Sequence, residues 1–239
     1  MVVARICRIG VAASAPKRSC QSSGISGCNT GASATATSAK SAPKSTRTPS
    51  RFDSRLSVSR DGIHFHRCGG RRPFLSPGPE GSFSSRMVWT MLHPVRMGDE
   101  LWFYFSGTSR DHNGTLDPAA NGRSGIGRAV MRLDGFVSAD AGYGGGEIVT
   151  PIIRFEGERL ELNLDTGGGG SVRVEIQDAY GKPMIGYTEQ DASFICGNSV
   201  RMPASWGTSQ DVSGLAGRPI RLRFVVRDCK LYAFQFTAA

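Results

Sequence analysis

The sequence predicts an all-β protein, and three observations lead to this fold class. Apolar and polar residues alternate with a period of two in several short stretches, most clearly over 160–164 and 172–176, as in strands with one buried face. Turn residues, such as Asp-Gly pairs and glycine runs, separate these stretches. No segment maintains a helical period for three turns, so the hydrophobic residues, 39% of the chain, are expected to form a core between sheets.

Residues 1–51 differ in composition from the rest of the chain. They are rich in Ser, Thr, Ala and Gly, and they carry eight basic residues but no acidic residue. Such a segment buries too little apolar surface to offset the entropy of ordering it, so we predict a disordered tail. The basic, Ser-bearing start is typical of an organelle transit peptide. Read-through from a misplaced start or a frameshift would also produce such a tail, so the sequence leaves the location open.

The net charge of +9 belongs largely to this tail. Beyond residue 51 the chain has 21 basic and 20 acidic residues, so no nucleic-acid partner is expected. No stretch approaches the roughly 20 apolar residues of a membrane span, so no membrane partner is expected either.

The six cysteines form no Cys-x-x-Cys pair, and no His is placed to complete a zinc site. We therefore predict no metal ion and no cofactor. We interpret Cys196 and Cys229 as two buried free thiols; a disulfide bond between them is the alternative.

Short strands and turns follow one another over 52–146. Asp-Gly occurs at a tight turn within 59–65, and 87–89 is a short strand. The run 101–107 is apolar on both faces, so we predict a central strand or one covered on each side. A polar loop over 109–124 and a strand over 125–133 follow. A second Asp-Gly turn before an aromatic residue, at 134–136, indicates a repeated blade-like unit.

Glycines at 144–146 are predicted to mark the seam before a second strand-rich region, 147–239. In that region 160–164 and 172–176 are predicted to form a hairpin across four consecutive glycines. A second hairpin is predicted for 220–227 and 231–236, with its turn at 228–230. The glycine runs do not lead into a helix, so they are not interpreted as phosphate-binding loops.

Several of these motifs together resemble a known family. They are 160–165, 171–178, 181–183, 215–224 and 231–234, and, upstream, 59–65, 72–75, 81–83, 98–104 and 125–136. They resemble the last blades of a five-bladed β-propeller, and the β-sandwich that follows it, in proteins similar to glycoside hydrolase families 32 and 43. The resemblance covers about 52–239. It implies one to two partial propeller blades over 52–146 and a C-terminal β-sandwich over 147–239.

The same resemblance implies hydrolysis of glycosidic bonds in oligo- or polysaccharides, with carbohydrate as the partner. The chain departs from the family pattern, because no first blade with its catalytic Asp precedes residue 52. Phe83-Ser84 also stands where relatives tend to carry Trp-Asp. We therefore expect a truncated copy. The alternatives are a non-catalytic carbohydrate-binding or interdomain β-sandwich, and an incomplete reading frame without independent function.

Glycoside hydrolysis requires two carboxyl groups, one protonated and one ionised, about 5–5.5 Å apart for retention or about 6.5–9.5 Å for inversion. Glu80 in a glycine-rich loop and Asp111 after the 101–107 strand are the predicted catalytic pair, with Asp117 as a further candidate carboxylate. The alternative for Glu80 is a solvated loop residue.

Three residues beside these acids are the predicted substrate-binding residues: Arg86, Arg110 and His112. Guanidinium and imidazole groups offer hydrogen-bond donors in fixed geometry for sugar hydroxyls. The alternative for the segment 109–112 is an Asx-type turn that ends the preceding strand.

Overall fold

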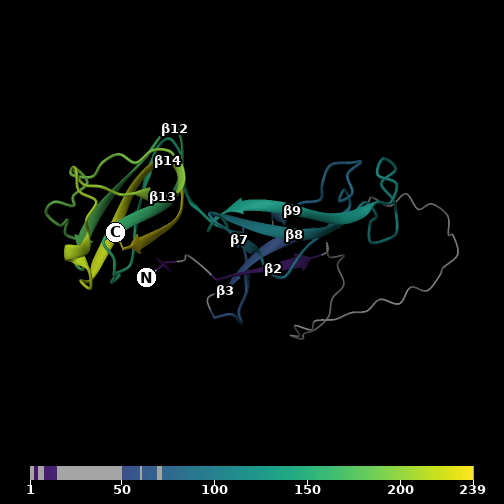
Figure 1. Cartoon of the computed structure of the whole chain (residues 1–239), viewed down its shortest axis with the longest axis horizontal. Helices are drawn as coiled ribbons and strands as arrows, with labels where there is room; N and C mark the ends of the chain where they lie inside the picture. The colour runs from purple at the N-terminus through teal and green to yellow at the C-terminus, as the bar shows by residue number, and fades with distance from the viewer. Residues whose placement is uncertain (1–2, 5–7, 15–49, 60, 69–71, 239) are drawn as a thin grey trace.

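The computed structural model describes residues 3–4, 8–14, 50–59, 61–68 and 72–238. These residues form three sheets, and the helical structure among them is a single short 3-10 helix, Ser213–Leu215. The predicted all-β fold class is therefore confirmed. Figure 1 shows two groups of strands, with sheet A in one group and sheets B and C in the other.

Sheet C positions most of the predicted site residues. Its strands are β6 (Met87–Thr90), β7 (Val95–Met97), β8 (Glu100–Thr108) and β9 (Ser124–Arg132). Strand β8 pairs with β9 along one edge and with β6 and β7 along the other. The prediction of a central strand over 101–107 is confirmed.

The two faces of sheet C have different surroundings. On one face Phe103 is buried and packs against Phe74 and Phe136, with ring centroids 5.3 and 5.9 Å away. On the other face Tyr104, Ile126 and Val130 are exposed. Sheet C is therefore covered on one side, and its other face exposes apolar side chains beside polar ones such as Arg128.

Sheet B contains part of the predicted tail. Its strands are β2 (Arg8–Ser14), β3 (Asp53–Ser59), β4 (His66–Arg67) and β5 (Pro73–Leu75). Strand β2 pairs with β3 over its whole length, and β1 (Val3–Ala4) pairs with a strand of sheet A. Strands β1 and β2 thus lie within 1–51, the segment for which a disordered tail is predicted, and the tail stays a prediction. The tail residues 1–2, 5–7 and 15–49 lie outside the described residues.

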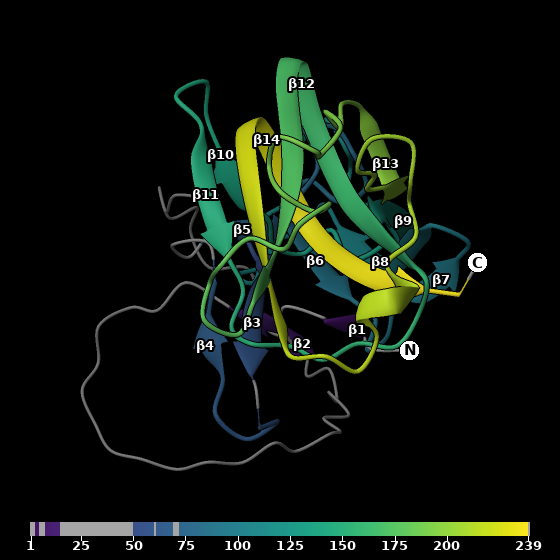
Figure 2. The same ribbon diagram turned by 90° about the vertical axis from the view of Figure 1, so that its left-hand side faces the viewer.

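Sheet A is built on two long strands, β12 (Arg159–Asp178) and β14 (Ile220–Thr237). Strand β13 (Asn198–Pro203) pairs with β12, and β10 (Ala139–Ala141) and β11 (Gly146–Val149) pair with β14. Figure 2 shows β10 and β11 beside β14, with β13 next to β12.

The two hairpins predicted for this region are wrong. Both halves of β12 pair with β14, from Arg159 opposite Thr237 to Asp178 opposite Ile220. The register shifts between Thr166 and Ser171, where the four glycines lie, and Asp228 opposite them has a φ of 43°. The glycines therefore form an irregularity within one strand instead of a turn between two.

Both halves of β12 contribute to one core. The alternating side chains are fully buried in the same cluster, and they are Leu160, Leu162, Leu164, Val172, Val174 and Ile176. This burial follows the period-two pattern of the sequence, so the predicted core face of these two stretches is confirmed although their partner is different.

The described cysteines, Cys68, Cys196 and Cys229, are free thiols, and no disulfide joins Cys196 to Cys229. Cys229 is buried as predicted, whereas Cys196 is exposed. Within the described ranges, no helix has the length and apolar character needed to cross a membrane.

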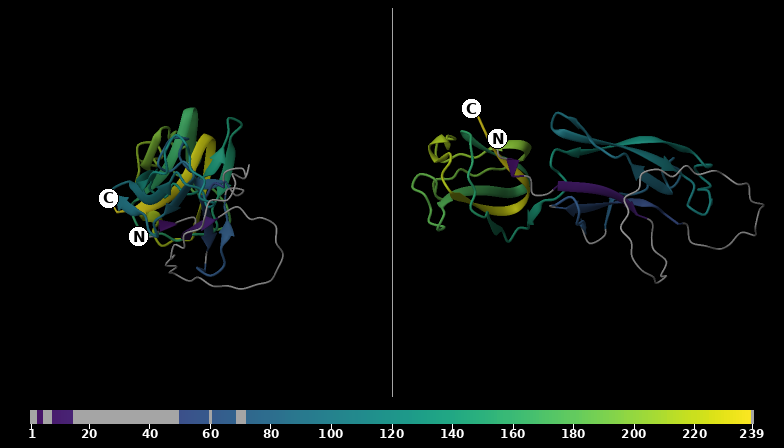
Figure 3. Two further views of the ribbon diagram at one scale, coloured as in Figure 1. Left: turned by 90° about the vertical axis from the view of Figure 1, so that its right-hand side faces the viewer. Right: turned by 90° about the horizontal axis from the view of Figure 1, so that it is seen from below.

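The two groups of strands lie end to end along the long axis of the molecule, as the right-hand view of Figure 3 shows. Several polar contacts join them, and one is the hydrogen bond from Arg132 Nη2 to the Leu164 carbonyl at 3.1 Å. The Asn163 amide donates to the Leu133 carbonyl at 2.6 Å, and Arg132 donates to the Asn198 side chain at 2.7 Å. Arg201 forms an ion pair with Asp99 at 2.8 Å. Sheet A and sheet C thus meet through fixed side chains.

Candidate functional site

Glu80 and Arg86 are in direct contact. Glu80 lies in the turn before β6, and its side chain is 53% exposed. Its Oε1 accepts hydrogen bonds from Arg86 Nη1 at 2.6 Å and from Arg51 Nη2 at 2.7 Å. Arg86 is only 6% exposed, and its Nε has no hydrogen-bond partner. One carboxylate oxygen is therefore shared by a buried and an exposed arginine.

Asp111, the second predicted acid, is engaged by backbone N–H groups. It is buried, and its carboxylate accepts hydrogen bonds from Asn113 at 2.9 Å, Thr115 at 2.7 Å and Ser50 at 3.2 Å. The first of these bonds is the bond of an Asx-type turn. The segment 109–112 therefore ends in an Asx-type turn, which is the alternative interpretation of this segment from the sequence.

Arg110 and His112, on either side of Asp111, are exposed. In the described part of the chain, no hydrogen bond or ion pair connects Asp111, Arg110 or His112 to Glu80 or Arg86. The two predicted acids nevertheless flank one segment, because the consecutive residues Ser50 and Arg51 contact Asp111 and Glu80 respectively.

Asp117 connects the two loops that carry these residues. It is 1% exposed, and it accepts hydrogen bonds from the Gly81 N–H at 2.7 Å and the Ala119 N–H at 3.0 Å. The Ser85 hydroxyl, these N–H groups and the charge of Arg86 lower the pKa of Asp117 to about 2, against the opposing effect of burial. Asp117 is thus an ionised, buried carboxylate that fixes the turn around Glu80.

These contacts limit the chemistry available at the predicted site. A general acid must present a proton, and a general base must present a free oxygen, within hydrogen-bonding reach of the substrate. Glu80 Oε1 is held by two guanidinium groups, and the Asp111 carboxylate by three N–H groups. Among the described residues, no group of three or more His, Cys, Asp or Glu side chains is placed to hold a metal ion.

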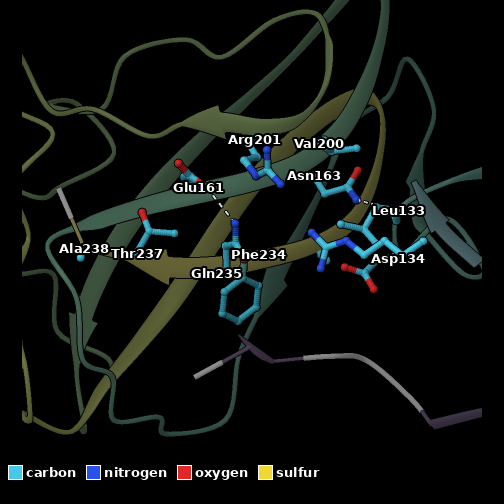
Figure 4. Close-up of a pocket in the computed structure, with 12 residues that line it drawn as sticks. Leu133, Asp134, Glu161, Asn163, Val200, Arg201, Phe234, Gln235, Thr237 and Ala238 are labelled. Atoms are coloured by element: carbon cyan, nitrogen blue, oxygen red, sulfur yellow. Dashed lines mark hydrogen bonds between the residues drawn. The ribbon is translucent and has the colours of Figure 1, made fainter. Parts of the chain in front are cut away.

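A pocket of about 310 Å³ lies where sheet A meets sheet C, and we call it the seam pocket (Figure 4). It is lined by side chains from β7, β12, β13 and β14 and from the turn after β9. None of the five predicted site residues lines it. Its polar residues are Arg96, Asp134, Glu161, Asn163, Arg201, Gln235 and Thr237.

Most of the polar side chains in the seam pocket are held by contacts within the chain. Glu161 accepts a hydrogen bond from Gln235 at 2.8 Å, as Figure 4 shows. The Asn163 amide is bonded to Leu133, and Arg201 is paired with Asp99. The sequence pattern contained a signal for two of these residues, since Glu161 and Asn163 alternate with the buried leucines of β12 and so lie on its other face.

Comparison with known proteins gives one structural match. No family model matches the sequence, and no curated protein matches it. A crystal structure of a glycoside hydrolase family 43 arabinoxylan arabinofuranohydrolase from Bacillus subtilis, in complex with cellotetraose, is similar with a TM-score of 0.25 and 11% identity. The match covers 77% of this chain and 47% of that enzyme, so the chain spans about half of its length. At this similarity the match assigns neither a family nor an activity.

Proposed function

We propose that this protein binds carbohydrate without hydrolysing it. The class of ligand follows from the sequence motifs that resemble glycoside hydrolase families 32 and 43. In this proposal 52–146 are related to propeller blades and 147–239 to the β-sandwich of those families. The proposal that the protein does not hydrolyse its ligand rests on one observation: Glu80 Oε1 accepts hydrogen bonds from both Arg51 and Arg86.

This observation bears directly on catalysis. Glycosidases protonate the leaving oxygen with a carboxylic acid that keeps its proton near neutral pH. Two guanidinium groups donate to one oxygen of Glu80, and charge-assisted contacts of this kind are short and strong. The same residue then orders the turn, and a sugar ligand is bound without bond cleavage.

The test measures binding and turnover on the same full-length chain. Isothermal titration with cello-, xylo-, arabino- and fructo-oligosaccharides is expected to give measurable binding to at least one of them. Chromatography of the same mixtures after prolonged incubation is expected to show no shorter products. Product release by the wild-type chain that Glu80→Gln abolishes would overturn the non-catalytic proposal.

A second candidate is glycoside hydrolysis by Glu80 and Asp111, with Arg86, Arg110 and His112 as substrate-binding residues. It is favoured by the position of the two acids on either side of Ser50 and Arg51, and by the 53% exposure of the Glu80 side chain. On this candidate Glu80→Gln removes turnover while thermal unfolding is unchanged. Absence of turnover in the wild-type chain would exclude it.

A further inference from the structure

We propose that the seam pocket is a binding site for a short neutral sugar, a mono- or disaccharide. This inference rests on the proposed carbohydrate binding, and it names the place and the size of the ligand. The volume of about 310 Å³ is at the lower end of the range for small-molecule sites, roughly 300–1,000 Å³. The pocket also lies at the junction of two groups of strands, where such sites are frequent.

The buried amide of Asn163 leaves one atom unpaired at this pocket. Asn163 is 5% exposed, and its Nδ2 donates to the Leu133 carbonyl at 2.6 Å. A carbonyl oxygen only accepts, so this bond fixes the orientation of the amide. Oδ1 then has no hydrogen-bond partner, and Figure 4 shows it directed away from Leu133. An unpaired buried acceptor costs free energy, which a ligand hydroxyl that donates to it removes.

The neighbouring polar groups are positioned in advance and retain hydrogen-bonding capacity. Gln235 bonds Oε2 of Glu161, and Asp99 holds Arg201. A carboxylate accepts several hydrogen bonds and a guanidinium has five N–H donors, so each group has sites left for a ligand. Side chains fixed by such contacts lose little conformational freedom on binding, which favours affinity.

The charges around the seam pocket select a neutral ligand. Asp134 and Glu161 contribute two negative charges, and Arg96 and Arg201 contribute two positive charges. The balance offers no net attraction to an anion or a cation. A hydroxyl group both donates and accepts, so an array of hydroxyls satisfies carboxylate, amide and guanidinium groups at once.

Asp134 provides a variant that separates binding from folding. It has a φ of 55°, a left-handed conformation that glycine adopts at lower cost. Asp134→Gly therefore removes the carboxylate from the pocket and relaxes the backbone in one change. Asn121 has a φ of 48° in an exposed loop outside the pocket, so Asn121→Gly is the matched control.

The experiment is a titration of the full chain with D-xylose, L-arabinose, D-glucose, D-fructose and their disaccharides, followed by ligand-observed NMR. Asp134→Gly is expected to weaken binding of the best sugar about tenfold or more, the loss that one good hydrogen bond represents. Asn163→Leu, which removes Oδ1, is expected to weaken it similarly, and Asn121→Gly to leave it unchanged.

Three results would overturn the site. Sugar binding at wild-type affinity in a folded Asp134→Gly variant would place the sugar elsewhere, and carbohydrate binding itself would stand. Tighter binding of acetate, an anionic probe, than of any sugar would contradict a neutral ligand. Absence of binding to every sugar would reject the proposed function together with the site, so the two failures are distinguishable.

Discussion

Arg86 Nη1 lies 2.6 Å from Glu80 Oε1, and the two side chains differ greatly in exposure, 6% for the arginine and 53% for the glutamate. Arg86 also acts on the buried Asp117 carboxylate, whose pKa it helps to lower. The arginine thus stands between an exposed and a buried anion. Its loss would remove a positive charge that acts on both carboxylates, and the first two predictions concern the stability that these charges contribute.

Arg86→Ala is expected to destabilise the protein much more than Arg51→Ala, although both arginines contact the same oxygen. Arg86 is buried, contacts Glu80 directly and also acts on Asp117, so its loss is expected to cost more than the roughly 0.2–1 kcal/mol of an exposed pair such as Arg51–Glu80. Urea unfolding followed by tryptophan fluorescence measures both free energies. Equal effects of the two substitutions would contradict the role of Arg86.

The contribution of Asp117 to stability is expected to disappear in acid. Its pKa in the folded protein, about 2, is below the ordinary value of about 3.9. The folded state therefore favours the ionised form, so the stabilisation is complete above about pH 4 and is lost as the pH falls from about 4 to about 2. Comparison of wild type with Asp117→Asn by urea unfolding at several pH values tests this. A difference in stability that stays constant with pH would contradict it.

Two glycines of β12, two positions apart, are expected to respond very differently to the same substitution. A Cβ atom at Gly170 would lie 2.1 Å from the backbone oxygen of Asp228, whereas at Gly168 it would meet no atom within 4 Å. Gly170→Ala must move the backbone of β14, and overpacking of this kind costs about 1–3 kcal/mol. Gly168→Ala is expected to change stability by less than about 0.5 kcal/mol. Thermal unfolding of the two variants is the measurement.

Cys196 is expected to react with alkylating reagents in the folded protein, and Cys229 only after unfolding. Burial raises the pKa of the Cys229 thiol to about 11, with smaller contributions from Asp165, Asp140 and Asp228. Thiolate is the reactive form, and Cys229 is 3% exposed, whereas Cys196 is exposed. Mass spectrometry of peptides after treatment with iodoacetamide, with and without urea, identifies the labelled residues. Rapid native labelling of Cys229 would show that sheet A opens.

The period-two patterns were sufficient to predict strands but insufficient to predict their partners. Leu160, Leu162 and Leu164 alternate with polar residues, and all three are buried as that pattern indicates. The hairpin between 160–164 and 172–176 was wrong, because four glycines are compatible with a turn and equally with an irregular strand. The structure contains one continuous strand because β14, which is distant in sequence, pairs with both halves.

Prediction of the site from the sequence was limited even more by contacts between residues that are far apart in the chain. Glu80 and Arg86 were both predicted from loop position, and they do touch. Nothing local indicated that Arg51 would share the same oxygen. The seam pocket was missed because its polar residues come from five separate segments. The regular alternation of Glu161 and Asn163 marked the outer face of β12, but the sequence held no sign that sheet C would cover it.

The pairing of β12 with β14 also determines when sheet A can form during protein synthesis. Arg159 pairs with Thr237, so the outermost rungs join residues made almost eighty positions apart. The ribosome must release β14 before the leucines of β12 obtain this neighbour, and pairing across such a separation is slow. Until then, the apolar face of β12 is exposed on the nascent chain, where chaperones bind. Translation speed over the last strand therefore bears on the yield of folded protein.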